Sequence, residues 1–447
     1  MSGNMDKLKT AFAPSWVKDA VFYQIFPDRF NKSERYHAVG RFVDWNAAPT
    51  RENMFGGNLA GIEDRLDYIA DMGFNAIYLC PIFKSNSNHR YHTVDYFEID
   101  PVLGTGKDFD RLLRHAHRLG IRVILDGVFN HCSRGFFQFN SLMELGENSP
   151  YVDWFHVKKF PLNAYSGKPN YECWWNYPAL PKFNTSNLDV RDFLFSVGEF
   201  WMRRGIDGWR LDVPNEIDDD SFWQEFRIRM KAINSDAYIV GEIWDSPERW
   251  LMGDQFDGVM NYPFRKAVLA HFFDENPILV EEFCKRLSEA FPETRAWNGR
   301  ERVAGDTPMN LLGSHDTVRL ASLPCSDRAR VSLAMALLFF VPGVPCVYYG
   351  EELGVAGGKD PDNRRTIDWK SLDLGSCWMR EFVKKLIELR KAEPALRYGN
   401  FAIEPQNRGF CIARTYKREK LLMEAEPDGS FKIIKNAKII VASRDFY

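Results

Sequence analysis

Residues 121–131 read IRVILDGVFNH, an apolar segment that ends abruptly in polar side chains. The run Val123–Leu125 is aliphatic without interruption, which is typical of a parallel strand buried on both faces. The carboxylate of Asp126 and the imidazole of His131 follow it directly. This stretch therefore predicts a buried strand whose carboxyl end carries polar chemistry.

Seven further β-rich segments are expected to be strands, and amphipathic helical patterns alternate with them. The strands are Ala20–Phe26, Asn75–Cys80, Gly208–Val213, Tyr238–Ile243, Phe256–Met260, Met309–Ser314 and Pro345–Tyr349. The helices are Leu59–Met72, Asp108–Leu119, Asp189–Arg204, Phe222–Ile233 and Arg328–Phe340, and Gly73 and Gly120 are suitable C′ residues for the first two. Eight strands alternating with helices predict an α/β fold, a closed (β/α)8 TIM barrel, in which the sixth strand has the weakest pattern.

Two parts of the chain are expected to lie outside the barrel. More than fifty residues rich in Tyr, Trp, Pro and Asn separate His131 from the helix at Asp189, which is too long for a barrel loop. After a helix at Met379–Lys391, β-like segments return at Phe410–Tyr416, Ser430–Ile434 and Lys438–Ala442. The predicted organisation is a barrel formed by 1–131 and 189–394, an inserted small domain at 132–188, and a short C-terminal β-domain at 395–447.

Composition restricts the classes of partner and compartment. The chain has 447 residues, 58 of them basic and 61 acidic, and a formal net charge of -3, which argues against nucleic-acid and anionic-membrane partners. Met1–Ser15 lacks the apolar core of a secretory signal, and the apolar stretch around Leu333–Val341 is too short to cross a bilayer. The eight cysteines include no CxxC pair and are interpreted as reduced thiols. A cytoplasmic protein is expected, and a secreted protein that has lost its signal is the alternative.

Polar side chains recur where the predicted strands end. The third strand ends in Asp126 and His131, the fourth in Arg210 and Asp212, the fifth in Glu242, and the seventh in the pair His315-Asp316. In a barrel these ends meet at one mouth, where TIM-barrel enzymes carry their active sites. A carboxylate-rich pocket with cationic partners suits acid/base chemistry on a neutral polar substrate.

Glycoside cleavage would use such a pocket directly. It needs one carboxylate at the anomeric carbon and one protonated carboxyl that donates to the leaving oxygen. Arg210 and Asp212, two apart on a strand, point to the same face, so the guanidinium is expected to lower the pKa of Asp212 and keep it a nucleophilic anion. Burial near other carboxylates is expected to raise the pKa of Glu242 so that it holds its proton. Asp316 would be the third acid and would bind sugar hydroxyls.

Each residue also has a plain structural interpretation. A single Asp at a strand end is commonly a turn residue or an N-cap, His131 alone could be a satisfied polar group or a metal ligand, and Arg210 could be a structural ion-pair partner. The joint pattern favours function, because chance would have to place acids at the same mouth from several strands.

Four motifs, DGVFNH, GWRLD, GEIW and SHD, resemble in order and spacing the core regions of the α-amylase superfamily of glycoside hydrolases. The resemblance runs from Trp16 to about Gly354. It implies Asp212 as nucleophile, Glu242 as general acid/base and Asp316 as transition-state stabiliser. It further implies supporting substrate contacts from Arg210, His131, His315 and Asp126, with Tyr91 stacking on the sugar.

Finer motifs are similar to neopullulanases, cyclomaltodextrinases and maltogenic amylases. Leu180–Asn184 (LPKFN) resembles their MPKLN segment, and Val213–Glu216 (VPNE) resembles their VANE segment, in which the glutamate is associated with the shape of the acceptor subsites. Trp244, next to Glu242, is the best candidate for stacking on a sugar ring. The aromatic residues of the long loop could stack on sugars or form the core of the inserted domain; they are Trp154, Trp174, Trp175 and Tyr177.

The chain also departs from those relatives. They usually carry a further β-domain before the barrel that helps to form a dimer, whereas here the barrel is expected to start almost at once, which leaves the oligomeric state open. The stretch after Phe30 lacks the Asn/Asp-rich pattern of their calcium loop, and hard cations need several oxygen ligands. No metal-ligating residues and no required cofactor are predicted, and calcium is optional.

The leading hypothesis is a retaining hydrolase that cleaves α-1,4 and optionally α-1,6 glucosidic bonds of maltooligosaccharides, cyclodextrins or pullulan, with some transglycosylation. An exo-acting α-glucosidase or a disaccharide isomerase is the second, although LPKFN and VPNE disfavour it. The third is a catalytically dead carbohydrate-binding subunit, which the joint presence of Asp212, Glu242 and Asp316 disfavours. Neither a P-loop nor a strand-borne GxGxxG supports a nucleotide-dependent enzyme.

Overall fold

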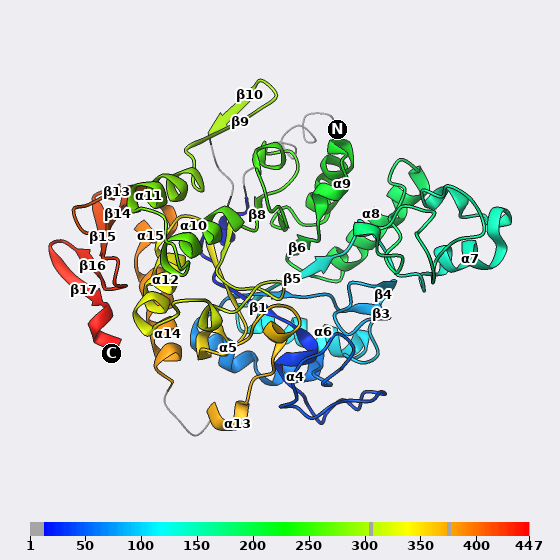
Figure 1. Cartoon of the computed structure of the whole chain (residues 1–447), viewed down its shortest axis with the longest axis horizontal. Helices are drawn as coiled ribbons and strands as arrows, with labels where there is room; N and C mark the ends of the chain where they lie inside the picture. Colours follow the sequence, from blue (N-terminus) through cyan, green and yellow to red (C-terminus); the bar gives the residue numbers. More distant parts are fainter. Residues whose placement is uncertain (1–12, 304–306, 373–376, 447) are drawn as a thin grey trace.

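A computed structural model describes residues 13–303, 307–372 and 377–446 (Figure 1). Its centre is an eight-stranded parallel sheet in the order β11-β12-β1-β2-β5-β6-β7-β8. An isolated parallel bridge between Met260 and Met309 joins the two edge strands and closes the barrel. The strands are β1 (Phe22–Ile25), β2 (Ala76–Leu79), β5 (Arg122–Gly127), β6 (Gly208–Leu211), β7 (Tyr238–Gly241), β8 (Gly258–Val259), β11 (Met309–Leu311) and β12 (Val344–Tyr348). The predicted TIM barrel is confirmed, and β8 is indeed the least regular strand.

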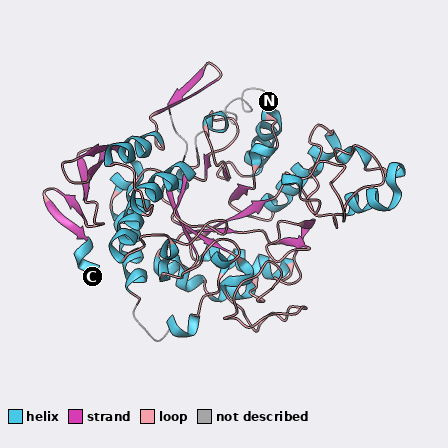
Figure 2. Cartoon of the chain, in the orientation of Figure 1, coloured by secondary structure: helices cyan, strands magenta, loops and turns pink. Residues whose placement is uncertain are grey.

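Helices surround these strands (Figure 2). They are α4 (Leu59–Asp64), α5 (Leu66–Met72), α6 (Gly106–Arg118), α8 (Leu188–Arg203), α9 (Asp220–Ile233), α10 (Tyr262–Phe272), α11 (Val280–Glu289), α12 (Arg328–Phe340) and α14 (Trp378–Ala392). Shorter helices are α2 (Ser15–Lys18), α3 (Pro27–Phe30), α13 (Trp369–Leu372) and α15 (Pro394–Tyr398). The packing is that expected of a barrel core, because the strands are buried and the helices turn apolar faces inward.

Local signals explain where the helices begin and end. A capping box between Thr105 and Asp108 starts α6, and Gly73 and Gly120 adopt positive φ after α5 and α6 as predicted. The prediction of a single helix over 59–72 is wrong. Arg65, at φ -110° and ψ 7°, departs from helical geometry and divides this segment into α4 and α5. The helices α10 and α11 were not expected from the sequence.

The segment between β5 and α8 forms a lobe at one side of the barrel, shown in cyan to green in Figure 1. It contains α7 (Phe137–Leu145) and three short 3-10 turns. Phe139 packs on Phe155 and Tyr171 with ring centroids 5.0 and 4.9 Å apart, so the lobe has an aromatic core of its own. A bridge between His131 and Lys182 ties both ends of the lobe to the barrel mouth. A hairpin of β3 (Phe83–Ser85) and β4 (Thr93–Ile99) lies in the loop that follows β2.

A five-stranded antiparallel sheet at the other side of the molecule, red in Figure 1, ends the chain. Its strands are β13 (Asn400–Pro405), β14 (Phe410–Tyr416), β15 (Glu419–Ala425), β16 (Phe431–Lys435) and β17 (Lys438–Ala442), and a hairpin of β9 (Thr294–Trp297) and β10 (Arg300–Val303) stands apart from it. Alternate residues of β14 and β15 are buried, including Phe410, Ile412 and Met423. The sheet therefore covers the barrel helices with one face. The exact limits of the three predicted domains stay a prediction.

The described part of the chain contains neither a membrane-spanning helix nor a cluster of metal-ligating side chains. No helix in it is both long and apolar enough to cross a membrane. Nor does it bring three His, Cys, Asp or Glu side chains together in an arrangement that could hold a metal ion.

Candidate active site

Strand register brings the predicted site residues to one end of the barrel. Asp126 on β5 pairs with Arg210 on β6, and Leu211 pairs with Gly241 on β7. The backbone N–H of Asp212 donates to Gly127 at 3.0 Å, and that of Glu242 donates to Leu211 at 3.0 Å, so the pairing continues past the strand ends. Asp126, Asp212 and Glu242 therefore lie side by side on consecutive strands, at the mouth formed by the carboxyl ends of the strands.

Arg210 is the hub of this cluster and is fully buried. Its Nη1 donates to Asp126 Oδ1 at 2.8 Å and to Asp212 Oδ1 at 3.1 Å. Its Nη2 forms an ion pair with Glu242 Oε2 at 2.8 Å. One cation thus faces three buried carboxyl groups, and it fixes their positions while compensating only part of their charge.

The second oxygen of Asp126 leads to a chain of hydrogen bonds across the barrel. Asp126 Oδ2 accepts from Tyr78 at 2.5 Å and from Tyr91 at 2.9 Å. The Tyr91 hydroxyl also lies 2.5 Å from Nε2 of His315, whose Nδ1 accepts from the Gln24 amide at 2.8 Å. Since Gln24 donates to Nδ1, the ring proton of His315 resides on Nε2, where it can reach Tyr91.

Asp316 lies on the opposite side of the mouth and is partly open to solvent. His315 Nε2 is 3.1 Å from Asp316 Oδ2, and Arg364 Nη2 is 3.4 Å from Asp316 Oδ1. Burial lowers the pKa of His315 well below its usual range, so the imidazole is neutral and acts as a hydrogen-bond donor. Arg364 is then the positive partner that orients Asp316.

Glu242 is held by donors on both oxygens. The backbone N–H of Val213 donates to Oε2 at 3.1 Å, and Trp244 Nε1 donates to Oε1 at 3.1 Å. Trp244 in turn stacks on Tyr262 with ring centroids 3.6 Å apart. Val213 adopts φ +34°, a left-handed conformation that is strained for a β-branched residue, and this conformation presents its N–H to the carboxyl group.

Burial dominates the titration of both principal acids. It raises the pKa of Glu242 to about 7, against the opposing charge of Arg210, as expected for a proton donor. Burial also raises the pKa of Asp212 well above its usual range, and the guanidinium offsets only part of this effect. The expectation that Arg210 would hold the pKa of Asp212 low is wrong in the free enzyme, because burial and the neighbouring carboxyl groups outweigh the effect of the guanidinium.

His131 and Glu216 line the side of the mouth next to the inserted lobe. The imidazole of His131 is buried, its pKa is lowered to about 3 by burial, and its ring stacks on Trp174 at 5.5 Å. Glu216 is half-buried, and its carboxylate and backbone carbonyl each accept a hydrogen bond from Lys182 Nζ at 3.1 Å. The LPKFN and VPNE segments are thus joined by an ion pair, and the partner of Glu216 comes from the lobe.

Several residues of the cluster were not foreseen from the sequence. Gln24 and Tyr78 lie within the first two strands, where apolar neighbours hide them. Arg364 follows the eighth strand, so extending the strand-end pattern to the last loop would have identified it. Tyr262 is a buried residue at the start of α10 whose hydroxyl has no hydrogen-bond partner in the described structure.

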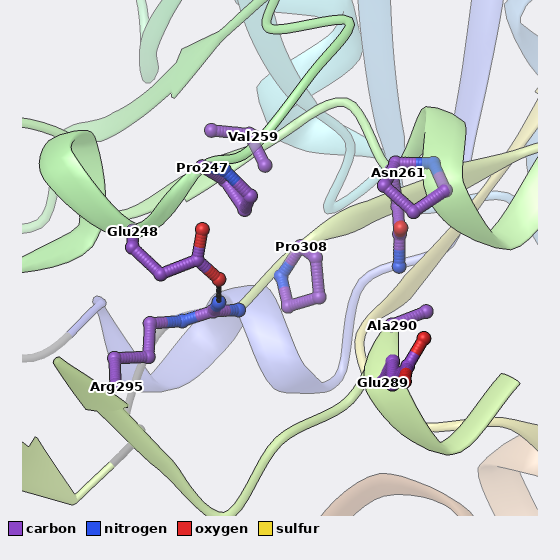
Figure 3. Close-up of a pocket in the computed structure, with 9 residues that line it drawn as sticks. Pro247, Glu248, Val259, Asn261, Glu289, Ala290, Arg295 and Pro308 are labelled. Atoms are coloured by element: carbon purple, nitrogen blue, oxygen red, sulfur yellow. Dashed lines mark hydrogen bonds and ion pairs between the residues drawn. The ribbon is translucent and has the colours of Figure 1, made fainter. Parts of the chain in front are cut away.

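A separate pocket lies between the loop after β7 and the end of α11 (Figure 3). It is lined by Glu248 and Arg295, which form an ion pair at 3.3 Å, together with Pro247, Val259 and Pro308. Its volume of about 30 Å³ leaves room for roughly one water molecule. It contains none of the predicted site residues and is too small for a sugar.

Comparison with known proteins agrees with this geometry. Residues 24–376 match the model of the alpha amylase catalytic domain. The chain is 41% identical over 420 residues to a cyclomaltodextrinase of a Bacillus species, covering 93% of this chain and 74% of that protein. It is 44% identical over 393 residues to neopullulanase 2 of Thermoactinomyces vulgaris, covering 87% of this chain and 65% of that protein.

Among solved structures, the cyclic α-maltosyl-(1→6)-maltose hydrolase of Arthrobacter globiformis superposes with a TM-score of 0.87 at 38% identity, covering 93% of this chain and 92% of that one. These matches confirm both the resemblance noted from the four motifs and the predicted enzyme class. The chain belongs to the alpha-amylase family and is a glycoside hydrolase of that family.

Proposed function

We propose that this enzyme hydrolyses α-1,4 and α-1,6 glucosidic bonds of maltooligosaccharides, cyclodextrins and pullulan with retention of anomeric configuration. The observation that carries the proposal is the placement of Asp212 and Glu242 on adjacent strands around one buried guanidinium. The names of the relatives, cyclomaltodextrinase and neopullulanase 2, support this class of substrate. An α-glucan oligosaccharide is accordingly the expected ligand.

In the proposed mechanism Asp212 attacks the anomeric carbon while Glu242 donates its proton to the glycosidic oxygen. The bond between carbon and leaving oxygen breaks, and a glycosyl ester of Asp212 forms. Glu242, now ionised, removes a proton from water, whose oxygen attacks the same carbon and releases Asp212. Asp316 binds sugar hydroxyls, while Arg210, Asp126, His131 and His315 hold the reacting groups and Tyr91 stacks on the sugar.

Strand spacing supports retention. Neighbouring strands lie roughly 4.8 Å apart, and Asp212 and Glu242 directly follow paired residues of β6 and β7. Retaining glycosidases hold their two carboxyl groups roughly 5–5.5 Å apart, whereas inverting enzymes leave roughly 6.5–9.5 Å for a water molecule. The adjacent register therefore fits direct attack by Asp212 better than attack by an interposed water.

Hydrolysis of maltoheptaose followed by proton NMR is expected to show the α-anomer of the new reducing end first, with the β-anomer appearing only by mutarotation. Retention at an α-bond requires this order, because two inversions restore the configuration. An initial β-product would contradict the double displacement. Separate digests of a cyclodextrin and of pullulan extend the test. If only maltoheptaose is cleaved, with stepwise release of glucose, the enzyme is an exo-acting α-glucosidase. If a disaccharide is converted without hydrolysis, the enzyme is an isomerase.

The alkaline side of the pH profile is expected to fall with an apparent pKa of about 7, set by Glu242 in the free enzyme. Burial raises this pKa from its usual value, so the carboxyl group is protonated below that pH and loses its proton, and with it the ability to act as an acid, above it. The measurement is kcat/KM for maltoheptaose between pH 4 and 10 (roughly, to bracket both limbs of the profile). A plateau that extends beyond pH 9, roughly two units past the expected midpoint, would contradict the assignment of Glu242 as the acid.

We further propose that the reaction needs no cofactor and takes place in the cytoplasm. The carboxyl groups of the chain itself supply both proton transfer and nucleophile, so calcium has at most a stabilising role. All eight cysteines are free thiols, which supports a reducing compartment.

A further inference from the structure

Four stacked aromatic rings run from the active-site mouth into the inserted lobe. His131 stacks on Trp174 with centroids 5.5 Å apart and planes inclined by 26°. Trp174 stacks on Trp175 at 4.9 Å and 14°, and it also faces Tyr177 at 6.2 Å and 30°. His131 is buried at the inner end, whereas Trp175 stands at the outer end. The stack therefore links the site to the surface of the lobe.

The outer rings of this stack are exposed, as are Phe137 and Tyr165 elsewhere on the same lobe. Trp175 is 71% exposed and Tyr177 is 55% exposed, whereas Phe139, Phe155 and Tyr171 of the same lobe are buried. One face of the Trp175 indole is covered by Trp174. Unlike Phe137 and Tyr165, both Trp175 and Tyr177 stack on Trp174, which leads to the active-site mouth. They therefore form an exposed aromatic surface next to the site, which suits the apolar face of a sugar ring.

The backbone at Trp175 adopts a strained conformation that holds the side chain outward. Trp175 has φ +48° and Asn176 has φ +60°, two successive left-handed residues that are not glycine. Such conformations persist where surrounding bonds over-determine them. Here Trp174 N–H donates to Leu180 at 2.9 Å, Tyr177 N–H donates to Trp174 at 2.9 Å, and Leu180 N–H donates to Tyr177 at 3.0 Å. The exposed ring is thus a fixed feature and not a frayed loop tip.

The inner end of the stack offers polar atoms to a sugar. His131 Nε2 and Trp174 Nε1 are both buried, and neither has a hydrogen-bond partner within the described residues. Glucosyl units combine apolar ring faces with hydroxyl groups, so they suit a surface that presents flat rings beside ring nitrogens. The stack thus combines flat ring faces with two ring nitrogens that lack a hydrogen-bond partner within the described residues.

We propose that Trp175, assisted by Tyr177, is a sugar-stacking subsite that binds a glucosyl unit of the substrate remote from the cleaved bond. The inference rests on the proposed function, because the ligand is the same α-glucan. Since Trp175 is separated from His131 by Trp174, a long or cyclic substrate reaches the outer ring and a short one does not. The subsite thus contributes to binding of long substrates and not to the chemical step.

The test compares Trp175→Ala, Trp175→Phe and, as a matched control, Phe137→Ala. Phe137 lies on α7 of the same lobe and is 67% exposed, but it packs on Tyr151 outside the stack. Trp175→Ala is expected to raise KM for maltoheptaose roughly tenfold with kcat unchanged, as the loss of one stacked ring implies. KM for maltotriose is expected to stay the same, Trp175→Phe should restore most of the affinity, and Phe137→Ala should behave as the wild type.

An unchanged KM for maltoheptaose in Trp175→Ala would overturn the proposal, as would an equal increase for maltotriose, which would indicate general damage to the lobe. Binding is measured independently by tryptophan fluorescence with maltoheptaose in an Asp212→Asn background, with and without Trp175→Ala. A weaker dissociation constant in the double variant is expected. Failure of the wild type to cleave any α-glucan would instead refute the proposed function, and the fluorescence titration would still decide whether Trp175 binds the sugar.

Discussion

Asp212→Asn is expected to lower kcat on maltoheptaose by roughly four orders of magnitude, because an amide cannot form the glycosyl ester. The fold should be unaffected, since the amide oxygen can still accept the 3.1 Å hydrogen bond from Arg210 and the residue keeps its size. KM is expected to change little, as the surrounding sugar-binding groups remain. The measurement is steady-state turnover, accompanied by the circular dichroism spectrum and the melting temperature.

Asp218→Asn is the matched control for this variant. Asp218 lies six residues further along the same connection, where its exposed carboxylate pairs with Arg249. Removing that charge should leave turnover within about twofold, because surface ion pairs contribute little. Near-normal turnover of Asp212→Asn, or a comparable loss in Asp218→Asn, would refute the role of Asp212 as nucleophile.

The cluster of acids could be anticipated because of a property of parallel barrels. All eight strands end at the same face, so polar residues read separately at the ends of β5, β6 and β7 must share one mouth. What could not be anticipated are the partners that approach from elsewhere. Gln24 and Tyr78 reach the site from within strands, and Lys182 reaches Glu216 across the lobe. Such contacts depend on tertiary placement and have no local signal in the sequence.

The fold shows the same division between local and tertiary information. Helix α12 and strands β14 and β17 were predicted with their observed bounds, because their patterns end at clear breaks. The two-residue strand β8 and the helix α10 have weak patterns, and packing on the barrel decides their conformation. Helix α11, by contrast, has a clear helical pattern that was overlooked, with Phe283, Cys284 and Leu287 buried on one face. Arg65 breaks a helix that periodicity alone continues, and its guanidinium lies 4.2 Å from the Trp369 ring centroid.

The electrostatics of the cluster required the structure for a similar reason. A single Arg–Asp pair lowers the pKa of the acid, and that pair is visible in the sequence. The structure adds Glu242 and Asp126 around the same guanidinium and buries all of them. The free site therefore favours an extra proton, which Glu242 needs in order to act as an acid. Asp212 must then be ionised when substrate binds and Glu242 remains protonated.

Glu242→Gln separates proton donation from the other steps. On maltoheptaose we expect kcat to fall by roughly three orders of magnitude, since the departing sugar oxygen receives no proton. A substrate whose leaving group needs no proton, such as α-maltosyl fluoride, should form the glycosyl ester at a rate within about tenfold of the wild type. Its reaction should also lose the alkaline limb that Glu242 imposes near pH 7.

The contacts of the carboxyl group explain why this variant should fold. A glutamine can turn its oxygen towards Val213 N–H and Arg210, which leaves its NH₂ group facing Trp244 Nε1 and removes the 3.1 Å hydrogen bond to Trp244. Trp244 is still held by its stack on Tyr262, so substrate binding should persist. Glu225→Gln, which removes a carboxylate paired with Arg229 on α9, is the control and should match the wild type on both substrates. An equal loss in the rate of glycosyl-ester formation on maltoheptaose and on the fluoride would mean that Glu242 does not act as the proton donor, because only the natural leaving group depends on that proton. Release of the ester is expected to slow on both substrates, since Glu242 also removes the proton from water.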